Sequence, residues 1–450
     1  MAANAAKEAT VNAADKDSQY RRKDSQFRDR WGWVVRFGMR DWAWEGEDEG
    51  GCQSYDIRES WAITRAGIQI PPNAARVLNE LCLLEKAVEQ SVQQQDFVLR
   101  SYCDGSALHT LNLEPSSQYT YGFPLLVTHR ADLCNILYEE ALQYGVQTRF
   151  SCSVNQIDFT RPAVRLSTGE TIAADLIIGA DGARSVCRDT LLGQPDPLQP
   201  SGYLTYRICI DINEVSQYPE VVDLIHPPRI HGWLGPAAHI VCSGLKGLFN
   251  VVLSQPEDRE AISFDVQRGD LRKLRRSFEN WEPRLQKLLE IAEETLRWSL
   301  PQSRQIESWV HTNGDKLINN DYNAQGAAMG FESALVLSEL ISQATSPSQI
   351  PQLLRACNKA RYPRCSKIDE LSHTALSFLE MPDGPLQIER DRQLRGPTDS
   401  PSSCHFALPD PVLQPWLQGF DAKAQADQLW EKVLEGKAVV NGEGEEGGGG

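Results

Sequence analysis

The string Asp175-Leu-Ile-Ile-Gly-Ala-Asp-Gly-Ala-Arg-Ser-Val-Cys-Arg188 is the strongest chemical signal in the sequence. An apolar run ends at Asp181, so a strand would present this carboxylate at its C-terminal end. Gly182 follows, where a larger side chain would block a ligand. Ser185 can cap the next helix, whose N–H groups favour a pyrophosphate, as do the two arginines of the string. The string therefore predicts a nucleotide-binding edge of a sheet.

Two further arginines lie at places where a ligand could meet them. Arg130 lies at the start of a helical pattern, and Arg207 lies on the β-like run Tyr203–Ile212. A guanidinium binds anionic oxygens through charge-assisted hydrogen bonds. Each arginine also has a purely structural interpretation, at a helix start or on a solvated strand face. Gly326 and Ala327 begin a segment rich in small residues, which favours either close approach of a ligand or close helix packing.

The periodicity of apolar residues predicts the elements that must position these groups. Residues 175–178 are apolar on both faces, as expected of a buried parallel strand. Strands followed by charged helices are expected over 200–300. Helices are expected over 73–90, 131–144, 324–346, 349–380 and 421–435, and strands over 147–150, 154–159, 163–166 and 171–178. Early alternation of strands and helices, followed by a β-rich block, predicts an α/β nucleotide domain with an inserted sheet domain.

The same pattern divides the chain into six segments. We expect an atypical N-terminus, a first cofactor-binding part, a β-rich substrate domain, a second cofactor-binding part made of helices, a C-terminal extension and a disordered tail. Their expected boundaries are 1–54, 55–195, 196–300, 301–380, 381–436 and 437–450.

Composition excludes several classes of protein. The 450 residues carry a net charge of −16, which argues against a nucleic-acid partner. The 11 cysteines are scattered singly, without metal-ligand spacing, and are typical of reduced thiols in an intracellular protein. No stretch is long and apolar enough to span a membrane, and the N-terminus has no signal-peptide core. We therefore expect a cytoplasmic protein without a metal site.

Taken together, the motifs resemble those of the class A flavoprotein monooxygenases, the family of salicylate hydroxylase and para-hydroxybenzoate hydroxylase. The resemblance covers roughly residues 56–436 and is greatest for the fungal branch. It rests on the Gly-Ala-Asp-Gly string and on segments at 66–76, 128–133, 201–207, 323–333 and 381–385. It implies an FAD-binding Rossmann-like domain of the glutathione-reductase type, an inserted β-sheet substrate domain and C-terminal helices.

The resemblance also implies roles for individual residues. Arg207 would be the catalytic residue that holds a phenolate, with FAD as cofactor, NAD(P)H and O2 as co-substrates and a phenolic or polyketide aromatic as substrate, in secondary metabolism. The oligomeric state stays open. FAD would be bound by Asp56, Gly67, Arg130, Asp181, Gly182, Gly326 and Ala327.

Two departures from the family pattern leave other functions open. The sequence contains no G-x-G-x-x-G motif, and the family's G-D-x-H-P segment is missing before Gln325. These segments contact the FAD phosphates and ribityl chain in the family. One alternative is therefore a pseudoenzyme, or the product of an altered gene model, that binds FAD weakly. Another is a flavoprotein reductase that transfers no oxygen.

Overall fold

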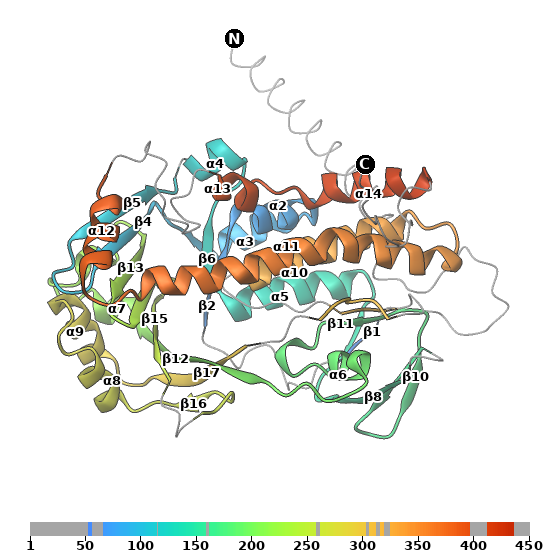
Figure 1. The fold of residues 1–450 in the computed structure, drawn as a ribbon, viewed down its shortest axis with the longest axis horizontal. Coiled ribbons are helices and arrows are strands. Elements are labelled where there is room, and N and C mark those ends of the chain that lie inside the picture. The colour runs from blue at the N-terminus through green and yellow to red at the C-terminus, as the bar shows by residue number, and fades with distance from the viewer. Residues whose placement is uncertain are drawn as a thin grey trace, which may run out of the picture.

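The computed structural model of the chain describes residues 53–55, 66–114, 116–158, 162–257, 262–302, 306–311, 316–318, 325–396 and 412–435. These residues form helices and five sheets (Figure 1). Parallel strand pairs, a large mixed sheet and a group of long helices are all present, so the predicted α/β class is confirmed.

The largest sheet has eight strands in the order β16-β17-β12-β15-β14-β13-β4-β5. Its strands from the expected substrate region are β12 (Gln199–Asp211), β13 (Arg229–Gly235), β14 (Ala238–Gly244), β15 (Leu248–Pro256), β16 (Gln267–Arg268) and β17 (Leu296–Gln302). The remaining two, β4 (Asp96–Ser101) and β5 (Ala107–Asn112), come from the segment that the sequence assigned to the cofactor domain. β4 runs parallel to β13, and Asp96 accepts a hydrogen bond from Arg229 at 2.8 Å. The sheet is therefore larger than the expected 196–300 block.

The two faces of this sheet have different partners. Leu204, Tyr206 and Ile208 of β12 face a core closed by α7 (Ile212–Val215), α8 (Leu271–Ser277) and α9 (Pro283–Ile291). Because side chains alternate along a strand, Thr205, Arg207 and Cys209 lie on the opposite face. We call this the inner face, because it is directed toward the small sheet β2-β6-β3 and the end of α11 (Ile350–Leu379). The strands of that small sheet are β2 (Gly67–Ile70), β3 (Ser91–Gln93) and β6 (Leu126–His129).

The parallel strands of the cofactor region form two separate pairs. β1 (Gln53–Tyr55) pairs with β7 (Gln147–Arg149), and β11 (Ile177–Gly179) pairs with β18 (Lys316–Ile318). The parallel direction of β11 agrees with the sequence. The expected burial of this strand on both faces is wrong, because the Ile178 side chain is 43% exposed. Among the described residues no strand joins the two pairs, so one side of β11 lacks the cover of a continuous sheet.

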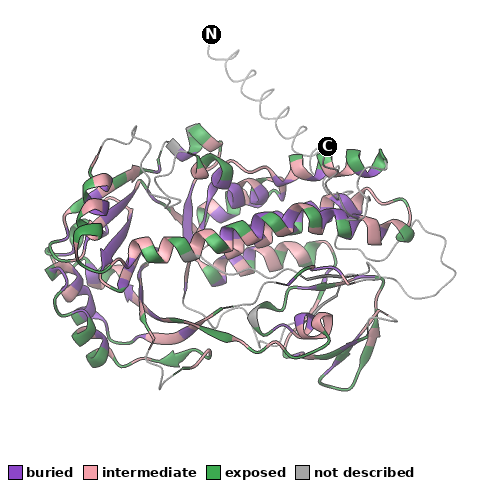
Figure 2. Ribbon diagram, viewed as in Figure 1, coloured by how far each residue is buried: buried purple, intermediate pink, exposed green. Residues whose placement is uncertain are grey.

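Long helices form the second core of the molecule. α2 (Pro72–Glu80), α10 (Gly326–Ser342), α11 and α14 (Ala422–Leu434) pack together, and Figure 2 shows the buried stripes along α10 and α11. The helix expected over 73–90 is interrupted: α3 (Leu84–Glu89) begins after Cys82, whose φ of 57° breaks the helical path. The helices expected near 131–144, 324–346, 349–380 and 421–435 are confirmed, the first as α5 (Arg130–Gln143).

A charged cluster lies inside this helical core. Glu332 of α10 is fully buried and pairs with Arg361 at 2.7 Å and Arg364 at 2.8 Å, both from α11. Asn73 of α2 donates to the same carboxylate at 2.7 Å. Arg364 also lies 3.9 Å from the centroid of the Phe420 ring. The cluster therefore joins α2, α10, α11 and the C-terminal segment.

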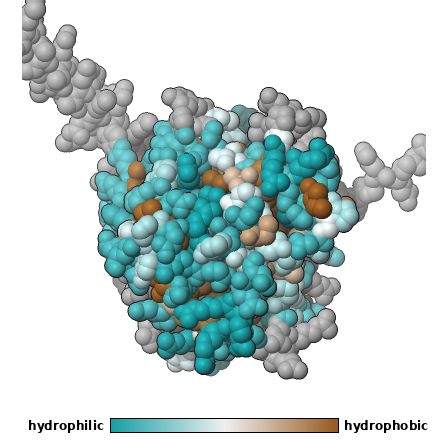
Figure 3. All heavy atoms as spheres, turned by 90° about the vertical axis from the view of Figure 1, so that its left-hand side faces the viewer, coloured by the Kyte–Doolittle hydropathy of each residue, from teal (hydrophilic) through white to brown (hydrophobic). Residues whose placement is uncertain are grey.

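The remaining elements are shorter. A three-stranded sheet of β8 (Val154–Asp158), β9 (Ala163–Leu166) and β10 (Thr171–Ala173) packs beside α6 (Val186–Leu192). The others are α4 (Ser116–Tyr121), α12 (Pro385–Leu394) and α13 (Leu413–Gln418). In the part of the chain that is described, no helix combines the length and apolar character needed to cross a bilayer. The face in Figure 3 is largely hydrophilic, with small separate apolar spots.

Replacement of Gly105 by alanine is expected to destabilise the eight-stranded sheet domain by at least about 2 kcal/mol. Gly105 has a φ of +66°, and an added Cβ would lie 2.0 Å from the buried carboxylate of Glu282. Urea unfolding would measure the change. Gly145→Ala is the matched control, because Gly145 has a φ of +80° and open space around its Cβ. Equal destabilisation by both variants would show that the contact with Glu282 is unimportant.

Candidate functional site

Arg207 lies on the inner face, and within the described part of the chain no carboxylate forms an ion pair with it. Its Nε atom is buried and has no hydrogen-bond partner, and its guanidinium lies 5.4 Å from the ring centroid of Trp298. No carboxylate in the described part of the chain is within ion-pair distance of it. Burial lowers the pKa of Arg207 to about 10, so the side chain remains a cation at neutral pH. An unpaired buried cation is costly, and a bound anion would remove this cost.

Arg130 contributes a second positive charge to this region. It is the first residue of α5, and its side chain is exposed. Its charge is the second cause, after burial, of the lowered pKa of Arg207, so the two guanidinium groups interact. The fold therefore lets the charge of Arg130 influence Arg207, although the two residues are 77 positions apart in the sequence (207 − 130). Two adjacent cations favour an anionic ligand.

Asp181 lies where the sequence placed it, at the end of β11, and caps the following turn. Its carboxylate accepts hydrogen bonds from the Ser185 hydroxyl at 2.5 Å and from the Cys187 N–H at 3.1 Å. Ser185 in turn accepts from the Arg188 N–H at 2.9 Å, so its predicted role as the N-cap of α6 is confirmed. Asp181 itself remains exposed, and its predicted contact with FAD stays a prediction.

Gly182 provides open space beside Asp181. Its φ is +71°, and no atom lies within 4 Å of an added Cβ. The two arginines that follow differ from expectation. Arg184 pairs with Asp265 at 2.8 Å, and Arg188 is buried and pairs with Asp196 at 2.6 Å. Each charge is already compensated within the protein. Open backbone at Gly182, rather than these arginines, is thus what this turn offers a ligand.

The N-terminus of α10 is a second place with unused hydrogen-bonding groups. Gly326 and Ala327 are half-buried and begin the helix, and no side chain caps it. Helix N-termini carry free N–H donors and a partial positive charge. The side-chain oxygen of Gln325, directly before them, is buried without a hydrogen-bond partner. This end of α10 thus presents both donors and an acceptor.

Glycine is required at position 67 for close packing, which the sequence did not indicate. An added Cβ would lie 3.1 Å from the side chain of Asn250 and 3.3 Å from that of Leu245. Glycine therefore lets β2 approach the inner face of the large sheet. Its predicted contact with FAD stays a prediction. Asp56, the expected ribose-binding acid, lies outside the described residues.

The sequence missed several polar groups near Arg207. Ser254 of β15 is 4% exposed, and its Oγ atom has no hydrogen-bond partner in the described structure. His239 of β14 lies 2.7 Å from the carboxylate of Glu380, which follows α11. Burial, and then this carboxylate, raise the pKa of Tyr203. Only the strand register brings these residues to one face, and single polar residues in a strand give no such signal.

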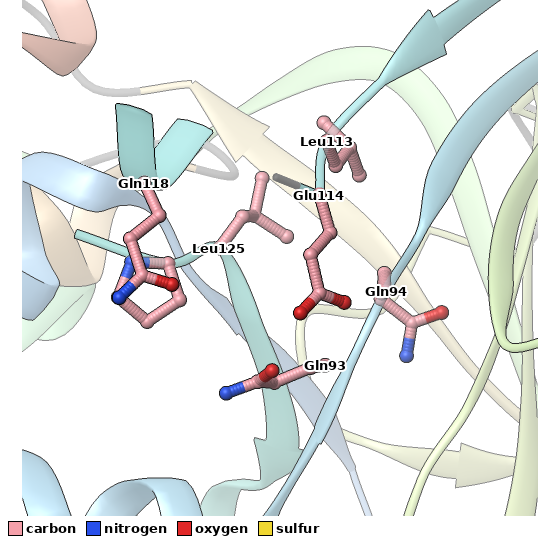
Figure 4. A pocket seen from close by; sticks show the side chains of 7 residues that line it. Gln93, Gln94, Leu113, Glu114, Gln118 and Leu125 are labelled. Atoms are coloured by element: carbon pink, nitrogen blue, oxygen red, sulfur yellow. The ribbon is translucent and has the colours of Figure 1, made fainter. Parts of the chain in front are cut away.

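A small cavity between the end of β3, the segment that joins β5 to α4, and the start of β6 can hold water but not an aromatic ring. Its volume is about 10 Å³, which is about the space of one water molecule. Figure 4 shows Gln93, Gln94 and Glu114 around it. The side-chain oxygen of Gln94 is buried and unpartnered, so it would accept from that water. This cavity is separate from the inner face.

Comparison with known proteins identifies the family. A family model described as "FAD binding domain" matches residues 58–226. FAD-dependent monooxygenase OpS4 of Beauveria bassiana is 31% identical over 377 residues, which are 80% of this chain and 87% of that protein. The chain belongs to the class A FAD-dependent aromatic monooxygenases. A 3-amino-4-hydroxybenzoate 2-monooxygenase of Streptomyces cremeus is 26% identical to this chain over 380 residues. The match covers 82% of this chain and 89% of the Streptomyces protein.

Solved structures share the fold of the monooxygenase. The structure titled "Crystal structure of CtdE in complex with FAD and substrate 4" has a TM-score of 0.71 at 18% identity and covers 85% of this chain and 92% of that chain. "Salicylate hydroxylase substrate complex" has a TM-score of 0.66 at 20% identity, covering 81% and 90%. The fold class, the enzyme class and FAD as the cofactor are therefore confirmed as predicted.

The described residues fit one end of FAD better than the other. The isoalloxazine ring has both N–H donors and carbonyl acceptors, which suit the open N-terminus of α10 and the unpartnered oxygen of Gln325. Gly182 leaves room for the chain that follows the ring. No glycine-rich turn for the diphosphate links the parallel strands of the described part of the monooxygenase. The ring end therefore fits, while the diphosphate end lacks the family motif.

Proposed function

We propose that this monooxygenase hydroxylates a phenolic or polyketide-derived aromatic substrate, with NAD(P)H as the electron donor and O2 as the oxygen source. The guanidinium of Arg207 supports this proposal most directly, because it has no carboxylate partner among the described residues and is influenced by the charge of Arg130. A phenolate or aromatic carboxylate supplies the missing negative charge. The hydroxybenzoate named for the Streptomyces relative is an anion of this kind. We also propose a cytoplasmic role in secondary metabolism.

Each residue of the site has a distinct task in this proposal. Arg130, Asp181, Gly182, Gly326 and Ala327 hold FAD, together with Asp56 and Gly67. When bound and reduced, FAD would supply the chemistry that activates O2, and O2 is the source of the transferred oxygen atom. Arg207 holds the phenolate oxygen by a charge-assisted hydrogen bond and so favours the electron-rich form of the ring. Trp298 shields this contact from water on one side of the guanidinium.

A second candidate is a family member that binds FAD weakly. The two separate parallel pairs and the exposed Ile178 support it, since no continuous sheet of described strands supports a diphosphate-binding turn. Charge-assisted hydrogen bonds contribute about 1.5–3 kcal/mol each. Loss of two such contacts would weaken FAD binding by a factor on the order of a thousand.

The visible spectrum of the purified chain tests both candidates. A yellow protein that consumes NAD(P)H faster when a phenol is present, and yields a hydroxylated product, is the expected result. Protein that stays colourless after incubation with excess FAD and gel filtration would support the weak-binding candidate. Oxidation of NAD(P)H without an oxygenated product would contradict the proposed function and favour a reductase.

A further inference from the structure

Strand register places a row of polar residues beside Arg207 on the inner face. Ser254 of β15 is paired with Thr205 of β12 on one side and with His239 of β14 on the other. Arg207 is paired with Val252, two residues before Ser254. Arg207 and Ser254 are therefore diagonal neighbours, roughly 7–8 Å apart.

Both diagonal neighbours have buried hydrogen-bonding atoms that the protein leaves unused. These atoms are Arg207 Nε and Ser254 Oγ, neither of which has a partner in the described structure. Buried polar atoms are normally paired, so an unpaired one calls for an explanation. A shared ligand explains both atoms, because the two residues are diagonal neighbours on the same face of the sheet.

The groups around Ser254 leave its hydroxyl available. His239 is hydrogen-bonded to Glu380 at 2.7 Å, and the Glu380 side chain is itself buried. Glu380 is also the acid that contributes to the raised pKa of Tyr203. This carboxylate is thus occupied by its neighbours. Ser254 is the member of the row whose hydroxyl remains for a ligand.

We propose that Ser254 is a specificity-determining residue that recognises a second oxygen substituent of the substrate. The substrate class is then an aromatic ring with an acidic oxygen at Arg207 and a hydroxyl, carbonyl or carboxylate oxygen on the opposite side, at Ser254. The proposal rests on the proposed function, since it assumes that the inner face binds an aromatic anion. It goes further than the proposed function because it requires the substrate to contact both Arg207 and Ser254.

Calorimetric titration of the full chain, incubated with FAD, with 4-hydroxybenzoate and with benzoate tests this proposal. The wild-type chain is expected to bind 4-hydroxybenzoate roughly five- to tenfold more tightly than benzoate. In Ser254→Ala the two dissociation constants become equal. Ser243→Ala, a buried serine on the same face but in the row beyond Arg207, should retain the wild-type ratio.

The outcomes separate the two levels of inference. Equal affinity of the wild-type chain for both probes, or an unchanged ratio in Ser254→Ala, would overturn the role of Ser254 while leaving the proposed function intact. Failure of the wild-type chain to bind either probe would contradict the anion site itself. Thermal unfolding provides the check on folding: because the Ser254 hydroxyl has no partner, Ser254→Ala should melt at or above the wild-type temperature.

Discussion

Replacement of Arg207 by glutamine is expected to lower kcat/KM for an anionic aromatic substrate by about ten- to a hundredfold. Arg207 is half-buried with a buried Nε atom, is influenced by the charge of Arg130 and lacks a carboxylate partner in the described structure. Loss of one charge-assisted hydrogen bond at such a site corresponds to about 1.5–3 kcal/mol. Steady-state oxygen consumption with 4-hydroxybenzoate measures the change. Arg207→Lys retains the charge but not the planar fork, so it should recover only part of the activity.

Arg297→Gln is the matched control for this experiment. Arg297 lies on the adjacent strand β17, but its partner in the register is Tyr206, so it lies on the opposite face from Arg207. Its activity should match the wild type. Equal losses in Arg207→Gln and Arg297→Gln would contradict an anion site on the inner face, because a general disturbance of the sheet would then explain both.

The same site predicts a pH dependence. Burial and Arg130 lower the pKa of Arg207 to about 10, so the guanidinium is charged below that pH and loses its proton above it. Because kcat/KM reports ionisation of the free enzyme, it should fall as the pH rises through about 10. This limb should be absent from the profile of Arg207→Gln.

Replacement of Glu332 by glutamine is expected to lower the free energy of unfolding by about 3–5 kcal/mol. Glu332 is fully buried and is the shared partner of Arg361 and Arg364. Without its charge, two guanidinium groups in the helical core would lack compensation. Urea unfolding followed by far-ultraviolet circular dichroism measures the change, with midpoint and slope analysed together.

Glu370→Gln is the matched control, because Glu370 lies on the exposed side of α11, the helix that carries Arg361 and Arg364. Glu370 is 65% exposed and pairs with Lys367 one turn earlier in α11. Exposed pairs of this kind contribute about 0–1 kcal/mol, so this variant should unfold close to the wild type. A loss in Glu332→Gln as small as that in Glu370→Gln would show that the cluster does not stabilise the fold.

Local pattern was enough to predict much of the fold and part of the site. The alternation of Leu204, Tyr206 and Ile208 predicts the strand that carries Arg207, and Ser185 marks the start of α6. The string ending in Asp181 and Gly182 likewise predicts a strand followed by a turn. These features depend on neighbouring residues, which a single sequence displays directly.

Contacts between distant segments were not predictable in this way. Asp96 meets Arg229 across 133 residues, and His239 meets Glu380 across 141. Neither pair has a local signal, and no strand was expected at β4 (Asp96–Ser101) from the sequence. Ser254 is a lone serine in an apolar strand, and only its register with His239 brings it into the argument. The predicted FAD contact of Gly67 stays a prediction, and Asp56 lies outside the described residues.

The long helix α11 has a mechanical consequence for the enzyme. Its 30 residues span about 45 Å, from the core around Glu332 to Phe378 beneath the large sheet. Because α11 packs into both the helical core and the core beneath the large sheet, it resists separation of the two cores. Pro363 removes one backbone hydrogen bond near its middle, so bending concentrates there. We therefore expect any change in the angle between the large sheet and the helical core to be centred on Pro363.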